Sequence, residues 1–295
     1  MQYEEFKQLL VDKIAMSVPF DTTVSLKTIR KNNGVVFDAV SISGPGDSIS
    51  PTFCLKGYYE QYRNGISPDF ITKEILREQS GFRRSGISAD KIVSGLDVKE
   101  RVRFKIVNYD MNALQLREIP HLKILDLAMV FYCKVDEGIL PDANILLRRD
   151  MLERNGIRED ELKELSVRNT EKEYPPVLEK ISSMLGFGAQ TGSACEEDDD
   201  ELYVLTNRKG VFGAAALFYP ETGALLRKKI GGKLFLLPSS VHEWIILPGN
   251  ETTKIRELNE LICEVNEMMV SQEEVLGSHA YLFDCETMNL GFLSY

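Results

Sequence analysis

Four polar residues in the stretch PSSVHEW carry the chemical groups of a hydrolytic site, namely Ser239, Ser240, His242 and Glu243. In hydrolases a hydroxyl, an imidazole and a carboxylate act together as the nucleophile, the base and the group that orients the base. In a β-strand, however, Ser240 and His242 would face one side and Ser239 and Glu243 the other. The nucleophile-elbow pattern G-x-S-x-G is also absent. We therefore expect no catalytic residues here, but a turn closed by serine hydroxyls and a candidate ligand pocket lined by these four residues.

The sequence also offers few groups for a metal ion. His121, His242 and His279 are far apart, and none has a second ligand three or four residues away, as the HExxH pattern requires. Cys285, Asp284 and His279 form the one set that could meet at a metal, and ordinary core or surface roles are commoner for such residues. We predict no metal site.

A phosphate-binding loop is the next candidate. Gly210, Gly213 and the alanines at 214–216 follow an apolar stretch and open a predicted helix, where free backbone N–H groups can hold a phosphate. Yet neither GxGxxG nor GxxxxGK[ST] spacing is present. Close packing of a helix on a sheet explains the small residues, and we expect no cofactor.

Basic residues alternate with apolar ones in RVRFKIVNY, at 101–109. In a strand, this alternation buries one face and gathers Arg101, Arg103 and Lys105 on the other. That face is a candidate interaction surface for an acidic protein partner or a weak site for nucleic acid, although a solvated strand face is commoner. The formal net charge of −10 argues against a dedicated nucleic-acid binder.

Composition and targeting signals indicate a cytoplasmic protein. The five cysteines are scattered without a CxxC pair, which is typical of reduced thiols. The N-terminal residues lack the pattern of a signal peptide. The longest apolar block, 124–133, is interrupted by Asp126 and is too short to span a bilayer, so we expect no membrane association.

Hydrophobic periodicity predicts two α+β domains, 1–170 and 202–295, joined by a linker at 171–201 that carries the acidic run EEDDDE. In the first domain, Asn33-Gly34 predicts a hairpin turn and Ser67 the start of a helix, within a mixed or antiparallel sheet. Residues 124–134 are predicted to form one strand. The second domain has the order β-α-β-β-α-β, which is that of a ferredoxin-like split unit.

Several segments carry a resemblance to known families, among them YVLTN, GAAALFYP and LPSSVHEWIILP, together with NNGVVFDAVSI and LDLAMVFY earlier in the chain. In order and over nearly the whole length, they resemble the bacterial family catalogued as domain of unknown function 5688. The second half is also similar to the YtpQ-like family of uncharacterised bacterial proteins. Neither family has an established activity, so the resemblance implies an intact two-part bacterial protein and supplies no catalytic residue.

Taken together, these patterns favour a binding or interaction module without catalytic activity, with a protein as one candidate for its unknown partner. Two alternatives remain open. One is a small-molecule hydrolase or transferase that uses Ser239, Ser240, His242 and Glu243. The other is a weak nucleic-acid binder that uses the strand at 101–105.

Overall fold

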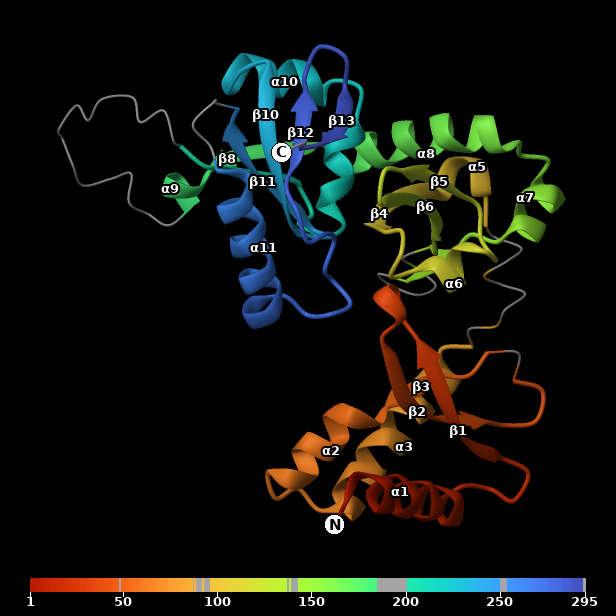
Figure 1. The fold of residues 1–295 in the computed structure, drawn as a ribbon. Helices are drawn as coiled ribbons and strands as arrows, with labels where there is room; N and C mark the ends of the chain where they lie inside the picture. Colours follow the sequence, from red (N-terminus) through yellow and green to blue (C-terminus); the bar gives the residue numbers. More distant parts are fainter. Residues whose placement is uncertain are drawn as a thin grey trace. The chain divides into compact units, whose positions relative to one another are not determined.

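The computed structural model describes residues 1–47, 49–86, 88, 92, 96–136, 138, 143–184, 201–249 and 254–293. The chain forms two compact units, shown in Figure 1 and described separately below. The first unit comprises Met1–Leu96 and Val135–Ala143, and the second comprises Asp97–Lys134 and Asn144–Tyr295. Each combines helices with antiparallel sheet, which confirms the predicted α+β class. Among the helices that the structure describes, none has the length and apolarity needed to cross a bilayer.

The first unit is a three-stranded antiparallel sheet in the order β1-β2-β3, covered by helices. Its elements are α1 (Tyr3–Ser17), β1 (Thr23–Arg30), η1 (Asn32–Gly34), β2 (Val36–Ser43), β3 (Thr52–Cys54), α2 (Leu55–Arg63) and α3 (Pro68–Arg84). Between β1 and β2, Asn33 and Gly34 adopt φ angles of 56° and 67°. This is the positive-φ turn that the Asn-Gly pair predicts. Ser67 caps α3 as expected, since its side chain accepts a hydrogen bond from the N–H of Phe70.

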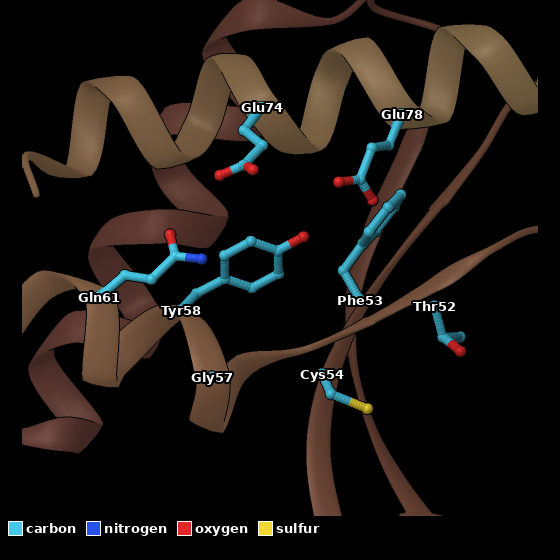
Figure 2. A pocket seen from close by; sticks show the side chains of 8 residues that line it. All are labelled: Thr52, Phe53, Cys54, Gly57, Tyr58, Gln61, Glu74 and Glu78. Atoms are coloured by element: carbon cyan, nitrogen blue, oxygen red, sulfur yellow. The ribbon is translucent and has the colours of Figure 1, made fainter.

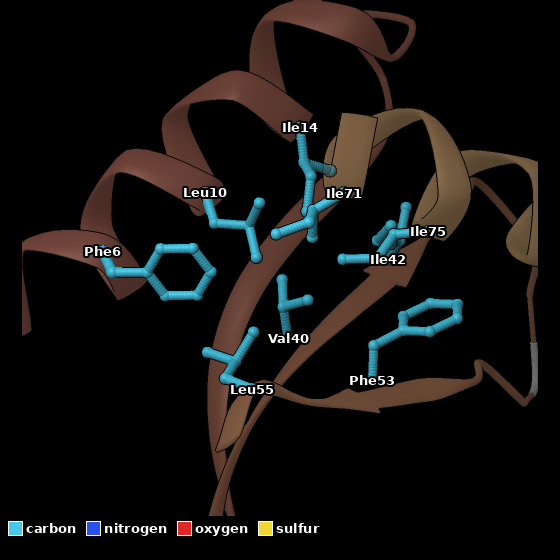
Figure 3. Packing of buried hydrophobic residues seen from close by; sticks show 9 residues of the cluster. All are labelled: Phe6, Leu10, Ile14, Val40, Ile42, Phe53, Leu55, Ile71 and Ile75. Carbon is cyan, nitrogen blue, oxygen red and sulfur yellow. The ribbon is translucent and has the colours of Figure 1, made fainter. Parts of the chain in front are cut away.

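Nine buried apolar residues fill the space between the helices and the sheet of the first unit (Figure 3). Helix α1 contributes Phe6, Leu10 and Ile14, whose spacing follows one helix face. The others are Val40, Ile42, Phe53, Leu55, Ile71 and Ile75. Because β3, α2 and α3 all contribute to this core, their positions relative to one another are fixed, and these three elements line the cavity described below.

The second unit begins with a four-stranded antiparallel sheet in which β6 is central, flanked by β4 and β5, with β7 also paired to β6. Its elements are α5 (Val98–Arg101), β4 (Val102–Asn108), α6 (Ala113–Leu116), β5 (His121–Ile124), β6 (Leu127–Lys134), β7 (Asn144–Leu146), α7 (Arg149–Asn155) and α8 (Glu159–Glu173). The prediction of one strand over 124–134 was wrong at its start. Leu125 turns the chain with a φ angle of 56°, so a β5–β6 hairpin forms and Asp126 lies in its turn.

The larger sheet of the second unit has six strands in the order β13-β12-β10-β11-β9-β8, all antiparallel. Its elements are β8 (Pro176–Lys180), α9 (Ile181–Met184), β9 (Tyr203–Asn207), η3 (Gly213–Phe218), α10 (Thr222–Lys229), β10 (Lys233–Ser240), β11 (Glu243–Pro248), α11 (Ile255–Met269), β12 (Tyr281–Asp284) and β13 (Asn289–Phe292).

The predicted order β-α-β-β-α-β occurs from β9 to β12, but the sheet does not have the ferredoxin-like strand order. A ferredoxin-like sheet places its first strand between the third and the fourth. Here the hairpin of β10 and β11 is central, and the fourth strand, β12, pairs with β10 instead. The physical reason is that residues 234–238 of β10 are all buried, and a strand buried on both faces belongs in the middle of a sheet.

Opposite faces of the β10–β11 hairpin carry different layers. On one face α11 packs through Ile262 against Leu237. On the other, Trp244 is fully buried and its indole N–H donates a hydrogen bond to the carbonyl oxygen of Ala214 in η3, at 2.9 Å. The three alanines of η3 are also fully buried. Their small size lets η3 lie directly on the sheet, as the sequence suggests.

The two compact units do not follow the predicted division at 170. Residues 97–134 group with the C-terminal sheet, because β4 contacts both α8 and η3. Part of the predicted linker also belongs to the fold, since β8 pairs with β9 along the edge of the six-stranded sheet. The acidic residues 196–200 lie outside the described residues, whereas Glu201 forms an ion pair with Lys180. That residues 1–170 and 202–295 fold as independent domains stays a prediction.

Candidate functional site

The four residues with hydrolytic groups lie at the closed end of the β10–β11 hairpin. A bulge between Pro238 and Ser240 shifts the strand register there. The hydroxyl of Ser239 donates a hydrogen bond to Glu243 Oε1 at 3.2 Å. The hydroxyl oxygen of Ser240 accepts one from the backbone N–H of His242 at 3.0 Å. Both serines therefore stabilise the turn, and Ser240 is bonded to the backbone of His242 and not to its ring.

The ring of His242 is held by groups that no sequence pattern connects with it. Its Nδ1 atom accepts a hydrogen bond from the backbone N–H of Phe212 at 3.0 Å, and Nε2 lies 3.4 Å from Glu274 Oε1. The accepting role of Nδ1 assigns the ring proton to Nε2, which donates toward the carboxylate. Phe212 also stacks on the imidazole, with ring planes 10° apart. The ring's lone pair is thus occupied by a backbone N–H, and it is not directed at a serine.

We predict that this histidine contributes to stability through the acceptor at Nδ1. Replacing His242 by Leu leaves the N–H of Phe212 without its partner, which should lower the free energy of unfolding by about 1–2 kcal/mol. Asparagine retains an acceptor near the position of Nδ1, so His242→Asn should lose clearly less. Urea unfolding followed by the fluorescence of Trp244, the one tryptophan of the chain, measures both variants. Equal losses would show that the acceptor is unimportant.

The three basic residues predicted to share a strand face at 101–105 have different surroundings, and the strand begins one residue later than predicted, at Val102. Arg103 donates to the carboxylate of Glu173 through Nε at 2.8 Å, and Lys134 donates to the other oxygen of the same carboxylate. Lys105 is half-buried, with its ammonium group 4.6 Å from the ring centroid of Phe212, and burial lowers the pKa of Lys105. Arg101, the last residue of α5, also has an interaction partner. The predicted interaction face is therefore not a uniform row of solvated charges.

An aspartate, a histidine and a tyrosine meet where the β5–β6 turn reaches β12. Asp126 Oδ2 lies 2.9 Å from His279 Nε2, and its Oδ1 accepts a hydrogen bond from the hydroxyl of Tyr281, also at 2.9 Å. The hydrogen bond to Asp126 raises the pKa of His279 above its usual value. Burial pushes the pKa of Asp126 upward, but the hydrogen bonds from His279 and Tyr281 outweigh it and hold that pKa below its usual value. This hydrogen-bonded cluster links the two sheets of the second unit, and it is an ion pair when His279 is protonated.

His279, Asp284 and Cys285, the one set in the sequence that could meet at a metal, do not converge. His279 faces Asp126, whereas Asp284 accepts hydrogen bonds from the backbone N–H groups of Glu286 and Thr287. Burial raises the pKa of Cys285 to about 11, so its thiol is protonated at neutral pH. Within the described part of the chain, no three histidine, cysteine or acidic side chains come together as a metal would require.

A cavity of about 410 Å³ opens in the first unit, between β3, α2 and α3 (Figure 2). It is lined by Thr52, Phe53, Cys54, Gly57, Tyr58, Gln61, Glu74 and Glu78. Glu74 and Glu78 extend from α3 toward Tyr58, whose hydroxyl points to the Glu78 side, and the amide of Gln61 lies beside the Tyr58 ring (Figure 2). Burial, followed by the charges of Glu78 and Glu74, raises the pKa of Tyr58 to about 12, so the phenol stays neutral. The cavity thus combines an aromatic face, hydrogen-bonding groups and two negative charges.

The sequence does not predict this cavity. Glu74 and Glu78 look like ordinary solvated residues of an amphipathic helix, and Tyr58 looks like part of a short helix before Asn64-Gly65. The one available signal was the spacing of the two acids, since residues four apart lie on the same side of a helix. Nothing in the sequence indicated that α2 and β3 leave space beneath them.

The model of a protein family described as "Family of unknown function (DUF5688)" matches residues 3–285. No curated protein matches the chain, and no solved structure matches it.

Proposed function

The chain belongs to DUF5688, a family of unknown function, and we propose that it is a non-catalytic binding module whose ligand site is the cavity of the first unit. The observation that carries this proposal is the cavity itself. Its volume of about 410 Å³ falls in the range of small-molecule sites, and aromatic and polar side chains both line it. Its walls come from β3, α2 and α3, which share one hydrophobic core, so the site is formed before a ligand arrives.

The contacts of the polar hairpin end speak against the rival hydrolase. A serine hydrolase needs a base that accepts the proton of the nucleophilic hydroxyl. Nδ1 of His242 already accepts a backbone N–H, and Nε2 faces the carboxylate of Glu274. Cysteine chemistry is equally disfavoured at the two buried thiols, because burial raises the pKa of Cys133 to about 12 and that of Cys285 to about 11.

The test is a fragment screen observed through the protein's backbone amide NMR signals, with cationic, neutral and anionic small molecules. We expect at least one class to shift the signals of residues at 52–61 and 74–78 and to leave those of β10 and β11 unchanged. In parallel, the protein and its Ser240→Ala variant are assayed on a panel of ester and amide substrates, where we expect no turnover. Turnover that Ser240→Ala abolishes would establish the hydrolase in place of the binding module.

We place this module in the bacterial cytoplasm, and its second half in the wider YtpQ-like group. Free thiols at Cys54, Cys133, Cys263 and Cys285 support a reducing compartment. Binding of nucleic acid through the strand at 101–105 has less support, because Glu173 neutralises Arg103. The proposal includes a protein as the partner, provided that this protein places one of its own chemical groups in the cavity.

A further inference from the structure

We infer that the cavity of the first unit takes an organic cation, with a primary ammonium or guanidinium group placed between Glu74 and Glu78. This inference rests on the proposed binding function and adds the chemical class of the ligand. It concerns a small amine or guanidine in solution.

The first support is the charge of the cavity. Glu74 and Glu78 are one turn apart on α3, and both carboxylates face the same cavity (Figure 2). No described residue reaches either carboxylate with a hydrogen bond or an ion pair, and the cavity lining contains no basic residue. Like charges four residues apart on a helix destabilise it by a few tenths of a kcal/mol. A cation placed between them relieves that repulsion, which an anion would increase.

The second support is Tyr58. Its ring lines the cavity between α2 and α3, and its hydroxyl points to the Glu78 side, while the carboxylate of Glu74 extends toward the ring (Figure 2). A neutral phenol offers an acceptor oxygen and the negative face of its ring, and cations bind to both. The amide of Gln61 supplies a further acceptor. All of these groups favour a donor that carries positive charge.

The choice of an organic cation over a metal ion follows from the number and kind of ligands. Calcium takes six to eight oxygen ligands and magnesium about six in a regular octahedron. The cavity offers two carboxylates on one helix, and the grouping of three or more acidic, histidine or cysteine side chains that would hold a metal is not found among the described residues. An ammonium ion needs only a few acceptors and gains from contact with Tyr58 and Phe53.

The experiment titrates the whole chain of residues 1–295 with cadaverine and with agmatine, by calorimetry and by amide NMR, using a neutral diol of similar length as the reference probe. We expect both cations to shift signals at 52–61 and 74–78, and the diol to shift them far less. The variant Glu74→Gln/Glu78→Gln should weaken cation binding by about tenfold or more, because charged hydrogen bonds are lost. The control Asp21→Asn/Glu60→Gln removes the same charge at two exposed positions outside the cavity and should bind as the wild type does.

The outcomes separate the two proposals. If the diol or an anionic fragment shifts the cavity signals as strongly as the cations do, the cation assignment fails and the binding function stands. The same conclusion follows if magnesium or calcium chloride alone binds and the amines do not, or if both double variants weaken amine binding equally. If no probe of any class shifts the cavity signals, both the cation assignment and the proposed function are overturned. Cation binding that only the Glu74→Gln/Glu78→Gln variant loses supports both.

Discussion

Alanine at position 213 is expected to lower the free energy of unfolding of the second unit by about 3 kcal/mol, at the upper end of the usual cost of overpacking. A Cβ atom on Gly213 would lie 2.1 Å from Thr206 Oγ1, 2.3 Å from the carbonyl oxygen of His242 and 2.8 Å from the backbone nitrogen of Asn207. Two of these neighbours are backbone atoms, which cannot rotate away. The hydrogen bond from Thr206 Oγ1 to the carbonyl oxygen of His242, at 2.8 Å, passes through the same place.

A second effect of this substitution has the opposite sign. Replacing glycine by alanine restricts the unfolded chain, which stabilises a protein by about 0.4–1 kcal/mol where the alanine fits. At Gly213 the overlap with backbone atoms outweighs this gain, so the net effect is destabilising. Gly81 in α3 is the matched control, because a Cβ there would have no atom within 4 Å. Gly81→Ala should leave the second unit unchanged and slightly stabilise the first.

Trp244 makes the measurement specific for the second unit. It is the one tryptophan of the chain, it is fully buried, and its indole is bonded to Ala214, the residue after Gly213. Urea unfolding followed by tryptophan fluorescence therefore reports the region in which the clash occurs. A midpoint for Gly213→Ala equal to that of the wild type and of Gly81→Ala would mean that η3 can move off the sheet at little cost.

Local features of the fold follow from the sequence where short-range chemistry determines them. The turn at Asn33-Gly34 requires positive φ angles, and Ser67 can satisfy a free N–H at the start of α3, so both are readable from neighbouring residues. The small residues of η3 likewise indicated close packing on a sheet. Strand order cannot be predicted in this way, because it depends on which apolar strand is buried on both faces. The burial of β10 places it in the middle of the sheet, and the order of the elements along the chain does not indicate this.

In the candidate sites, too, neighbouring residues determine some features and residues distant in the sequence determine others. The turn at Ser240 and His242 could be anticipated, since both residues belong to one hairpin. The partners of His242 come from Phe212 and Glu274, which are distant in the sequence and carry no motif. In the sequence, Asp126 interrupts an apolar block that predicts one strand. A positive φ angle at Leu125, which few leucines adopt, turns the chain there and places Asp126 in the turn. The surroundings of His242 therefore depend on contacts with residues that are distant in the sequence.

Asp126→Asn is expected to destabilise the second unit by about 2 kcal/mol near pH 5.5, which is typical of a lost hydrogen bond to a charged group. Asp126 accepts hydrogen bonds from His279 and Tyr281, both at 2.9 Å, and its side chain is 22% exposed. An asparagine keeps the shape and removes the charge. Asp110→Asn is the control, because Asp110 is exposed in a nearby turn and its side chain should contribute less than about 0.5 kcal/mol.

The stability lost in Asp126→Asn should depend on pH, and the pKa shifts of His279 and Asp126 determine the direction of that dependence. The pKa of His279 is raised in the folded protein, so its contribution is complete below the usual histidine value of about 6.5 and is lost as the pH rises through the raised pKa. The pKa of Asp126 is lowered, so its contribution is present above the usual value of about 3.9 and is lost as the pH falls through the lowered pKa. The difference between wild type and Asp126→Asn is therefore largest between about pH 4 and pH 6.5 and decreases above that range.

Two measurements check this dependence. The chain has three histidines, so NMR can follow each imidazole, and the pKa of His279 should fall in Asp126→Asn. Unfolding followed by the fluorescence of Trp244 gives the stability difference at each pH. The ring of Trp244 packs edge-on against that of Tyr281, with centroids 5.6 Å apart, so its fluorescence reports on this region. A constant difference between wild type and variant across the whole range would contradict the prediction. It would mean that the carboxylate acts as a neutral spacer, and that the ionic contact between the two sheets contributes nothing through charge.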